Sequence, residues 1–217
     1  MKDNHVKEIR DRAAGSKKSK LRENIEALVI AVLLALFIRA FVVQAFKIPS
    51  GSMQDTLLIG DYILVNKFIY GIKAPFSNYT VIPVKDPKRG DIIVFKYPQD
   101  PSKDFIKRVI AVGGDTLEIR DKQVFVNNKP VEDDGYAVHS DLSVRPFGFD
   151  ARDNLRSITV PEGKLFVMGD NRDESNDSRF WGFVDVSAVR GKAFLIYWSW
   201  DREDFGARWS RIGKLIE

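Results

Sequence analysis

The sequence predicts a mainly β, antiparallel folded-sheet or barrel-like domain behind one N-terminal transmembrane helix. Three features support this: a basic tail, an apolar run of twenty residues, and a long remainder of short β-type runs separated by turn signals. The 217 residues suffice for one sizeable globular domain. We therefore expect a basic tail over 1–24, an anchor over 25–46 and a β-rich domain over 47–217.

The distribution of charge and the scarcity of cysteine and histidine exclude several function classes. Residues 1–24 hold eight Lys/Arg and four Asp/Glu, so the tail accounts for the whole net charge of +4. The rest of the chain is balanced, which argues against nucleic acid as a partner. Cysteine is absent, and His5 and His139 are the only histidines. Disulfides, thiolate nucleophiles and multi-histidine metal sites are excluded, and we expect neither a metal nor a cofactor.

The apolar run ALVIAVLLALFIRAFVVQAF, Ala27 to Phe46, predicts the anchor. Twenty helical residues span about 30 Å, the thickness of a bilayer core. A cleaved signal peptide is the alternative, since the unbroken part ends at Ile38, but no small-x-small site follows it. Arg39 is acceptable if its side chain reaches the far interface. By the positive-inside rule the tail should be cytoplasmic and the β domain extracytoplasmic.

Seven runs after the anchor are rich in β-branched and aromatic residues and predict strands. They are Asp61–Tyr70, Asp91–Tyr97, Ile106–Val112, Thr116–Ile119, Gln123–Val126, Leu165–Met168 and Ala193–Trp200. Glycine, proline and asparagine turns separate them, and none of the chain after the anchor has a sustained helical period. Residues 131–157 are polar and turn-rich, so we interpret them as a small irregular insertion.

The stretch FKIPSGSMQDTLLIGD, Phe46 to Asp61, holds two serines where the anchor ends. A serine hydroxyl is a poor nucleophile at neutral pH, so a catalytic role requires a base elsewhere. His139 lies in the irregular insertion, where a solvated loop histidine is the commoner situation. Lys107, in DFIKRVIAVGGD, fits better because strand alternation puts it on one face with Phe105, Val109 and Ala111. An apolar setting lowers a lysine pKa, although a lysine in a strand is more often a surface residue.

Three ordered blocks resemble bacterial type I signal peptidases, membrane-bound serine endopeptidases that remove signal peptides from exported proteins. The blocks are IPSGSMQDTLLIGDYILVNKFIYGIK from Ile48, FIKRVIAVGGD from Phe105 and MGDNRDESNDSRFWGFV from Met168. The resemblance extends from the anchor nearly to the C-terminus. It departs from some members of the family in having one anchor and only a short insertion.

The resemblance implies a role for each matching residue. Ser52 would be the nucleophile and Lys107 the general base, acting as a Ser-Lys dyad through an acyl-enzyme. Ser50 and the Ser52 N–H would form the oxyanion hole, and Ser175 would hydrogen-bond and orient the lysine amine. Asp177, Arg179 and Arg108 would brace the site. Substrate contacts would come from Phe46, Ile48, Pro49, Met53, Leu57, Ile63, Asp104, Phe105 and Ile106.

The resemblance also implies partners and a location. The partners would be exported preproteins with signal peptides, cleaved after small-x-small sequences such as Ala-x-Ala, together with membrane lipid and a nearby secretion translocon. The location would be the bacterial cytoplasmic (inner) membrane, crossed once with the N-terminus inside and the catalytic domain on the periplasmic or extracellular side. Two alternatives remain: an anchored β domain that binds a partner without catalysis, and a related Ser-Lys hydrolase such as a pilus-type processing enzyme.

Overall fold

The computed structural model describes residues 20–36, 42–73, 80–82, 84–133 and 135–216. The chain forms two compact units, Met1–Val42 and Val43–Glu217. Residues 20–36 of the first unit are helical. No helix within the described ranges is both long and apolar enough to cross a membrane. Residues 37–41 of the predicted anchor lie outside these ranges.

The predicted C-terminal boundary of the anchor is wrong. We expected the anchor to continue to Phe46, but β1 (Val43–Lys47) is a strand paired antiparallel with β2 (Asp61–Asn66). Phe46 lies opposite Ile63 and packs against a cluster of buried side chains. The apolar residues at the end of the run therefore belong to the β domain. The prediction missed this because a short apolar stretch looks the same in a sequence whether it forms a buried strand or the end of a membrane helix.

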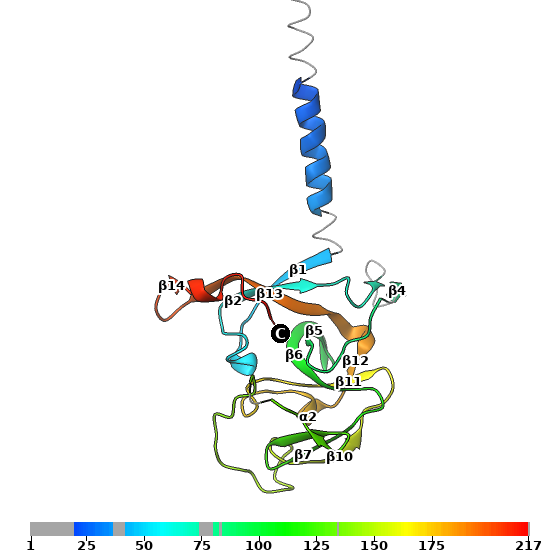
Figure 1. Cartoon of the computed structure of the whole chain (residues 1–217), viewed down its shortest axis with the longest axis vertical. Helices are drawn as coiled ribbons and strands as arrows, with labels where there is room; N and C mark the ends of the chain where they lie inside the picture. Colours follow the sequence, from blue (N-terminus) through cyan, green and yellow to red (C-terminus); the bar gives the residue numbers. More distant parts are fainter. Residues whose placement is uncertain (1–19, 37–41, 74–79, 83, 134, 217) are drawn as a thin grey trace, which may run out of the picture. The chain divides into compact units, whose positions relative to one another are not determined.

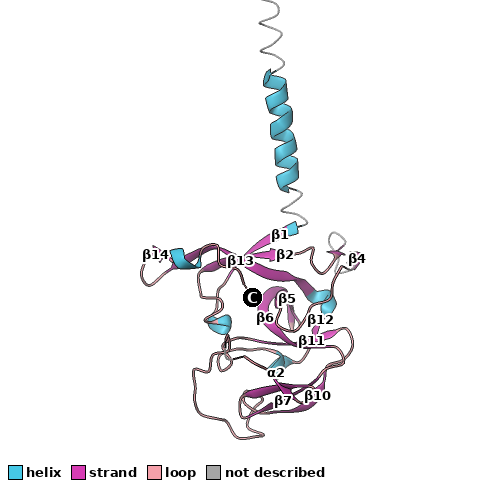
Figure 2. Ribbon diagram, in the orientation of Figure 1, coloured by secondary structure: helices cyan, strands magenta, loops and turns pink. Residues whose placement is uncertain are grey.

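The β domain consists of a large antiparallel sheet, a smaller one and a two-stranded ribbon (Figures 1 and 2). The large sheet has the order β1, β2, β13 (Val189–Asp201), β5 (Ile92–Tyr97), β6 (Asp100–Val112), β11 (Lys164–Met168) and β12 (Val184–Asp185), with β14 (Gly206–Ala207) paired to β13. The small sheet has the order β10 (Leu155–Thr159), β7 (Thr116–Arg120), β8 (Gln123–Val126) and β9 (Lys129–Pro130), and β3 (Ile72–Lys73) pairs with β4 (Thr80–Ile82). In the described part of the chain β1 and β12 remain at the ends of the large sheet, so it is folded but open.

Four short helical segments complete the described elements of this unit. They are η2 (Gly51–Met53), α2 (Ser178–Trp181), η3 (Val186–Ala188) and η4 (Trp209–Arg211). Asp177 caps α2, since its side chain accepts a hydrogen bond from the Arg179 N–H. All seven predicted strands are confirmed as β2, β5, β6, β7, β8, β11 and β13, with shifted ends in all of them except β8. The predicted insertion contains no named strand until β10 begins at Leu155.

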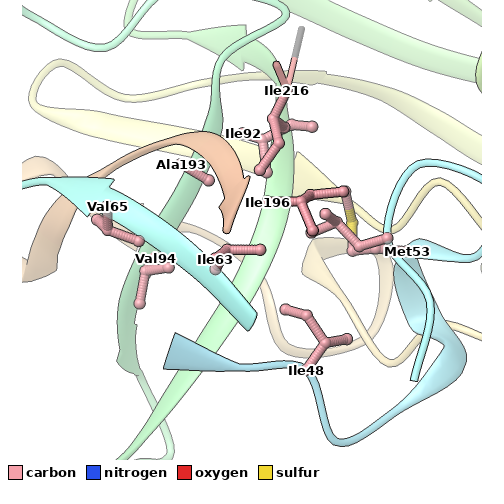
Figure 3. Close-up of a cluster of buried hydrophobic side chains, with 10 residues drawn as sticks. Ile48, Met53, Ile63, Val65, Ile92, Val94, Ala193, Ile196 and Ile216 are labelled. Atoms are coloured by element: carbon pink, nitrogen blue, oxygen red, sulfur yellow. The ribbon is translucent and has the colours of Figure 1, made fainter. Parts of the chain in front are cut away.

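Strand alternation distributes apolar side chains between the cores. In β5, Ile92 and Val94 belong to one buried cluster, whereas Ile93 and Phe95 belong to another on the opposite face. Both faces of this central strand are therefore covered. The first cluster joins the segment after β1 to β2, β5 and β13 (Figure 3). A third cluster lies between the two sheets and contains residues of β6, β7, β8 and β11.

Candidate active site

Ser52 lies on η2, a single 3-10 turn fixed to the sheet on both sides. Ile48 donates its N–H to the Asp61 carbonyl at 2.9 Å, and Gly60 donates to the Ile48 carbonyl at 3.1 Å. Met53 is fully buried in the first cluster, where Figure 3 shows it beside Ile196. Because this neighbour is buried, the position of Ser52, which is itself half-buried, is restrained.

Lys107 reaches Ser52 from the centre of β6. The Lys107 Nζ and the Ser52 Oγ are joined by a hydrogen bond of 2.6 Å, although the residues are 55 positions apart. Lys107 pairs in register with Ile93 of β5, and only 4% of its surface is exposed. The predicted shared face is confirmed for Phe105 and Val109, which pack in one cluster. Ala111 instead packs in another cluster, beyond a register shift between β6 and β11.

Burial is the main influence on the Lys107 amine. It lowers the pKa of Lys107 from 10.5 to about 8, against the opposing charges of Asp177 and Asp170 and with a smaller contribution from Arg179. No carboxylate within the described ranges forms an ion pair with this lysine. About a tenth of the amine is therefore neutral at pH 7, far more than for an ordinary lysine, and the neutral form is the one that can act as a general base.

Ser175 comes close to Ser52 through a glycine. A Cβ on residue 169 would lie 2.3 Å from the Ser175 Oγ and 2.3 Å from the Ser52 carbonyl oxygen, so only glycine fits between them. Ser175 is 5% exposed, and its Oγ has no hydrogen-bond partner in the described structure. The predicted hydrogen bond from Ser175 to Lys107 is therefore not formed, because the hydroxyl lies against Gly169 instead.

Asp177 and Arg179 brace the loop that carries Ser175. Arg179 Nε and Nη2 each donate to the Asp177 carboxylate at 2.8 Å, and the Gly169 N–H donates to Asp177 Oδ2 at 3.0 Å. Arg179 also donates to the carbonyls of Arg152 and Arg172 at 2.9 and 2.6 Å. Both side chains are buried, and no hydrogen bond of the described residues joins either of them to Ser52, so the pair fixes the loop.

Asp170 is a residue of this site that the sequence prediction missed. Arg108, next to Lys107, donates to its two carboxylate oxygens at 2.9 and 2.8 Å. Thr56, four residues after Ser52, donates to Asp170 Oδ2 at 2.6 Å. One carboxylate thus joins the segment of the serine to the strand of the lysine. The signal available in the sequence was the position of Asp170, just after the predicted strand that ends at Met168 and within the third block.

The predicted substrate contacts divide into surface and core. Ile48, Met53, Leu57 and Ile63 are at most 2% exposed and belong to one buried cluster. These four side chains form the core beneath the serine segment, and their contact with a substrate stays a prediction. Phe46, Phe105 and Ile106 are half-buried, while Pro49, Ser50 and Asp104 are exposed.

His139 does not replace the lysine as the partner of Ser52. Its Nδ1 lies 3.8 Å from Asp173, and burial lowers the pKa of His139. None of the hydrogen bonds of the described residues joins it to Ser52. Within the same ranges, no group of three or more His, Cys, Asp or Glu side chains could hold a metal ion.

Comparisons with known proteins identify the family. The family model described as signal peptidase, peptidase S26, matches residues 21–198. A signal peptidase I of Pseudomonas aeruginosa is 38% identical over 215 residues, covering 85% of this chain and 75% of the relative. One of Aquifex aeolicus is 38% identical over 232 residues, covering 82% and 85%.

Among solved structures, a signal peptidase I of Enterococcus faecalis is 35% identical, with a TM-score of 0.40, and covers 50% of this chain and 97% of that chain. The match of the family model and the identity to the Pseudomonas and Aquifex relatives extend over most of the chain. The chain therefore belongs to the signal peptidase family, peptidase S26, and is a serine peptidase similar to bacterial signal peptidase I.

Proposed function

We propose that the chain removes N-terminal signal peptides from exported preproteins with a dyad of Ser52 and Lys107. The observation that carries the proposal is the 2.6 Å hydrogen bond between a serine hydroxyl and a buried lysine amine whose pKa is lowered to about 8. A serine needs an adjacent base to become a nucleophile, and a lysine needs desolvation to become that base.

The reaction proceeds through an acyl-enzyme. The neutral amine of Lys107 takes the Ser52 proton as the Ser52 oxygen attacks the scissile carbonyl. The resulting ammonium gives its proton to the leaving amine, which releases the mature protein. A water molecule then hydrolyses the ester, with Lys107 again as base, and the signal peptide departs.

Ser50 and Ser175 support this chemistry. The Ser50 hydroxyl is exposed beside η2 and makes no cap hydrogen bond, so it is free to rotate toward the developing oxyanion together with the Ser52 N–H. The Ser175 Oγ has no hydrogen-bond partner among the described residues. Since an unpartnered buried hydroxyl is costly, it gains most by turning to the Lys107 amine when that amine becomes charged.

The substrate backbone extends along the open edge of β6. Among the described strands, β11 pairs with β6 only from Arg108 onward, while β5 covers the other edge from Asp100 to Arg108. An extended peptide added beside Asp104–Lys107 places alternate side chains against the half-buried Phe46 and Ile106. Both side chains pack against the first buried cluster, and we expect the shallow surface they form to favour small residues at the first and third positions before the cut.

The membrane placement is part of the same proposal. The apolar run that begins at Ala27 anchors the chain in the bacterial cytoplasmic (inner) membrane, with the basic tail inside and the β domain on the periplasmic or extracellular side. Ser52 follows closely after this run, so the site meets a substrate whose own apolar segment is still in lipid. A translocon delivers that substrate.

The test is cleavage of one exported precursor by the full-length protein in detergent, with product masses read by mass spectrometry. We expect a single cut after Ala-x-Ala, with large residues rejected at the first and third positions and tolerated at the second. Proline after the cut should block cleavage. Ser52→Ala is the matched control and should leave the precursor whole.

Two outcomes would contradict the proposal. Efficient cleavage after leucine or phenylalanine, with alanine disfavoured, would refute the specificity. A precursor left whole by the wild-type protein would refute the function itself. A pilin-type precursor in the same panel distinguishes general signal-peptide removal from specialised pilus processing.

A further inference from the structure

A buried ion pair connects the C-terminal segment to the segment that follows Ser52. Arg211, at the end of η4, donates from Nη2 to Asp61 Oδ2 at 2.6 Å and from Nε to Asp61 Oδ1 at 3.1 Å. The Asp61 side chain has no exposed surface, and that of Arg211 is 11% exposed. The two residues are 150 positions apart, so the contact is purely tertiary.

The same guanidinium reaches back toward the nucleophile. Arg211 Nη2 also donates to the Thr56 carbonyl at 2.9 Å. Asp61 in turn accepts the Leu58 N–H at 2.8 Å and the Ser199 hydroxyl at 2.6 Å. Both ends of the turn from Thr56 to Asp61 are thus held by one side chain, and the turn is tied to β13.

Thr56 makes this contact relevant to the dyad. Its hydroxyl donates to Asp170, whose carboxylate also holds Arg108 beside Lys107. Its neighbour Leu57 donates an N–H to the Met53 carbonyl at 2.7 Å, directly after Ser52. A displacement of Thr56 would therefore move the serine relative to the lysine.

The C-terminal segment is itself fixed where it delivers Arg211. The Gly213 N–H donates to the Ile196 carbonyl at 2.8 Å, and the Ile196 N–H donates to the Lys214 carbonyl at 2.9 Å. Ile216 then enters the buried cluster that contains Met53, Ile196 and Ile48 (Figure 3). Arg211 is accordingly a rigid support rather than a mobile surface arginine.

From this geometry we propose that Arg211 is a positioning residue, which holds the Ser52 hydroxyl at the Lys107 amine through Asp61 and the Thr56 carbonyl. The inference rests on the proposed function of the dyad. Many buried Arg-Asp pairs serve stability alone. Here Arg211 also bonds the Thr56 carbonyl, in the segment that carries Ser52, so the Arg211–Asp61 pair helps to align the reacting atoms. A displacement of such atoms by about 1 Å costs up to about 100-fold in rate.

Arg211→Lys tests the proposal. A lysine keeps the charge beside Asp61, but its single ammonium cannot reproduce the planar fork that serves Asp61 and Thr56 together. We expect kcat for precursor cleavage by the full chain to fall about tenfold, with KM within about twofold of the wild type. The pH at half-maximal kcat should not move, since Arg211 does not contact Lys107.

A second readout needs no precursor. Acylation of Ser52 by a small activated ester, followed by mass spectrometry, should also slow about tenfold in Arg211→Lys. Failure of the proposed function would appear as wild-type protein that leaves the precursor whole. Failure of the present inference would appear as Arg211→Lys protein that acylates at the wild-type rate.

Two further variants separate alignment from stability. Asp61→Asn combined with Arg211→Met removes both charges, leaves no unpaired buried carboxylate, and should show the same fall in kcat at an unchanged KM. Arg89→Lys alters another arginine-carboxylate pair, with Asp115, and should keep kcat. The inference is overturned if the double variant, folded by circular dichroism, keeps wild-type kcat, or if Arg89→Lys loses as much as Arg211→Lys.

Discussion

Two buried lysines in this chain have opposite surroundings. Lys107 is 4% exposed, and its amine contacts the Ser52 hydroxyl without an ion pair among the described residues. The Lys122 side chain, in the turn between β7 and β8, is 11% exposed and lies 3.0 Å from Asp153 and 2.5 Å from Asp173. Burial alone therefore does not produce a base. The lysine pKa is lowered where burial is not matched by an ion pair with a carboxylate, as at Lys107.

The surroundings of Lys122 form a balanced ion-pair network. Burial would raise the pKa of Asp153, but hydrogen bonds from Arg152, the Arg145 N–H and Lys122 outweigh it and hold this pKa at about 2. Arg152 donates to Asp153 at 2.9 and 2.7 Å. The network supports the Ser175 loop, since Arg179 bonds the Arg152 carbonyl. The surroundings of Lys122 pair its charge with carboxylates, whereas the surroundings of Lys107 make its amine easier to deprotonate.

The largest effect should come from removing the dyad. Ser52→Ala and Lys107→Met should each lower kcat by at least about 10⁴-fold while circular dichroism shows an intact fold. Lys107→Arg should be equally inactive, because a guanidinium stays protonated and cannot serve as a base. Full activity in Lys107→Arg, measured by precursor cleavage, would refute the Ser-Lys mechanism.

The same methionine substitution should change stability with opposite signs at the two lysines. Lys122→Met leaves Asp153 and Asp173 short of a cation and should destabilise the fold by about 3 kcal/mol. At Lys107 the lowered pKa corresponds to a desolvation cost of about 3 kcal/mol below pH 8. The lost hydrogen bond to Ser52 offsets about 1 kcal/mol of this. Lys107→Met should therefore be more stable than the wild type by about 2 kcal/mol at pH 7.

The pH dependence of that gain gives the control. Between pH 8 and 10.5 the unfolded wild-type chain binds more protons at Lys107 than the folded one, so wild-type stability rises with pH across this interval. Urea unfolding should show the advantage of Lys107→Met shrinking over the same range and reversing above it to a deficit of about 1 kcal/mol, where only the lost hydrogen bond to Ser52 remains. A constant difference from pH 6 to pH 11 would mean that Lys107 is not desolvated.

Activity should follow the titration of Lys107. At pH 7 about a tenth of the amine is neutral, so kcat/KM should rise about tenfold per pH unit below 7 and level off above pH 9. The midpoint should lie near pH 8, where the pKa is lowered, rather than near 10.5. His139→Gln is the matched variant and should leave the midpoint in place. A midpoint well below that of Lys107 that disappears in His139→Gln would make the histidine the base, since burial lowers the pKa of His139.

Sequence reasoning predicted the strands from local signals, and it selected Ser52 and Lys107, which a hydrogen bond joins in the structure. Strand alternation indicated an apolar face for Lys107, and the three blocks supplied Ser52 and Lys107 through the family resemblance. The contacts of Asp170 and Arg211 could not be predicted in this way, since they join residues 62 and 150 positions away. The burial of Met53 and Ile63 in the core could not be predicted, because a core residue and a pocket residue share the same apolar composition. The strand at Val43–Lys47 was missed for a similar reason.

The smallest predicted effect concerns two neighbouring serines with opposite bonding. Ser178 Oγ accepts the Val167 N–H at 3.0 Å, whereas the Ser175 Oγ has no partner in the described structure. Ser178→Ala should therefore lower stability by about 1 kcal/mol and leave kcat nearly unchanged. Ser175→Ala removes a buried hydroxyl that has no hydrogen bond to lose, so its melting temperature should be no lower than that of the wild type. If the hydroxyl turns to Lys107 during the reaction, kcat should nevertheless fall about tenfold. Calorimetry and precursor cleavage on both variants measure the contrast, and an unchanged kcat in Ser175→Ala would remove this serine from the mechanism.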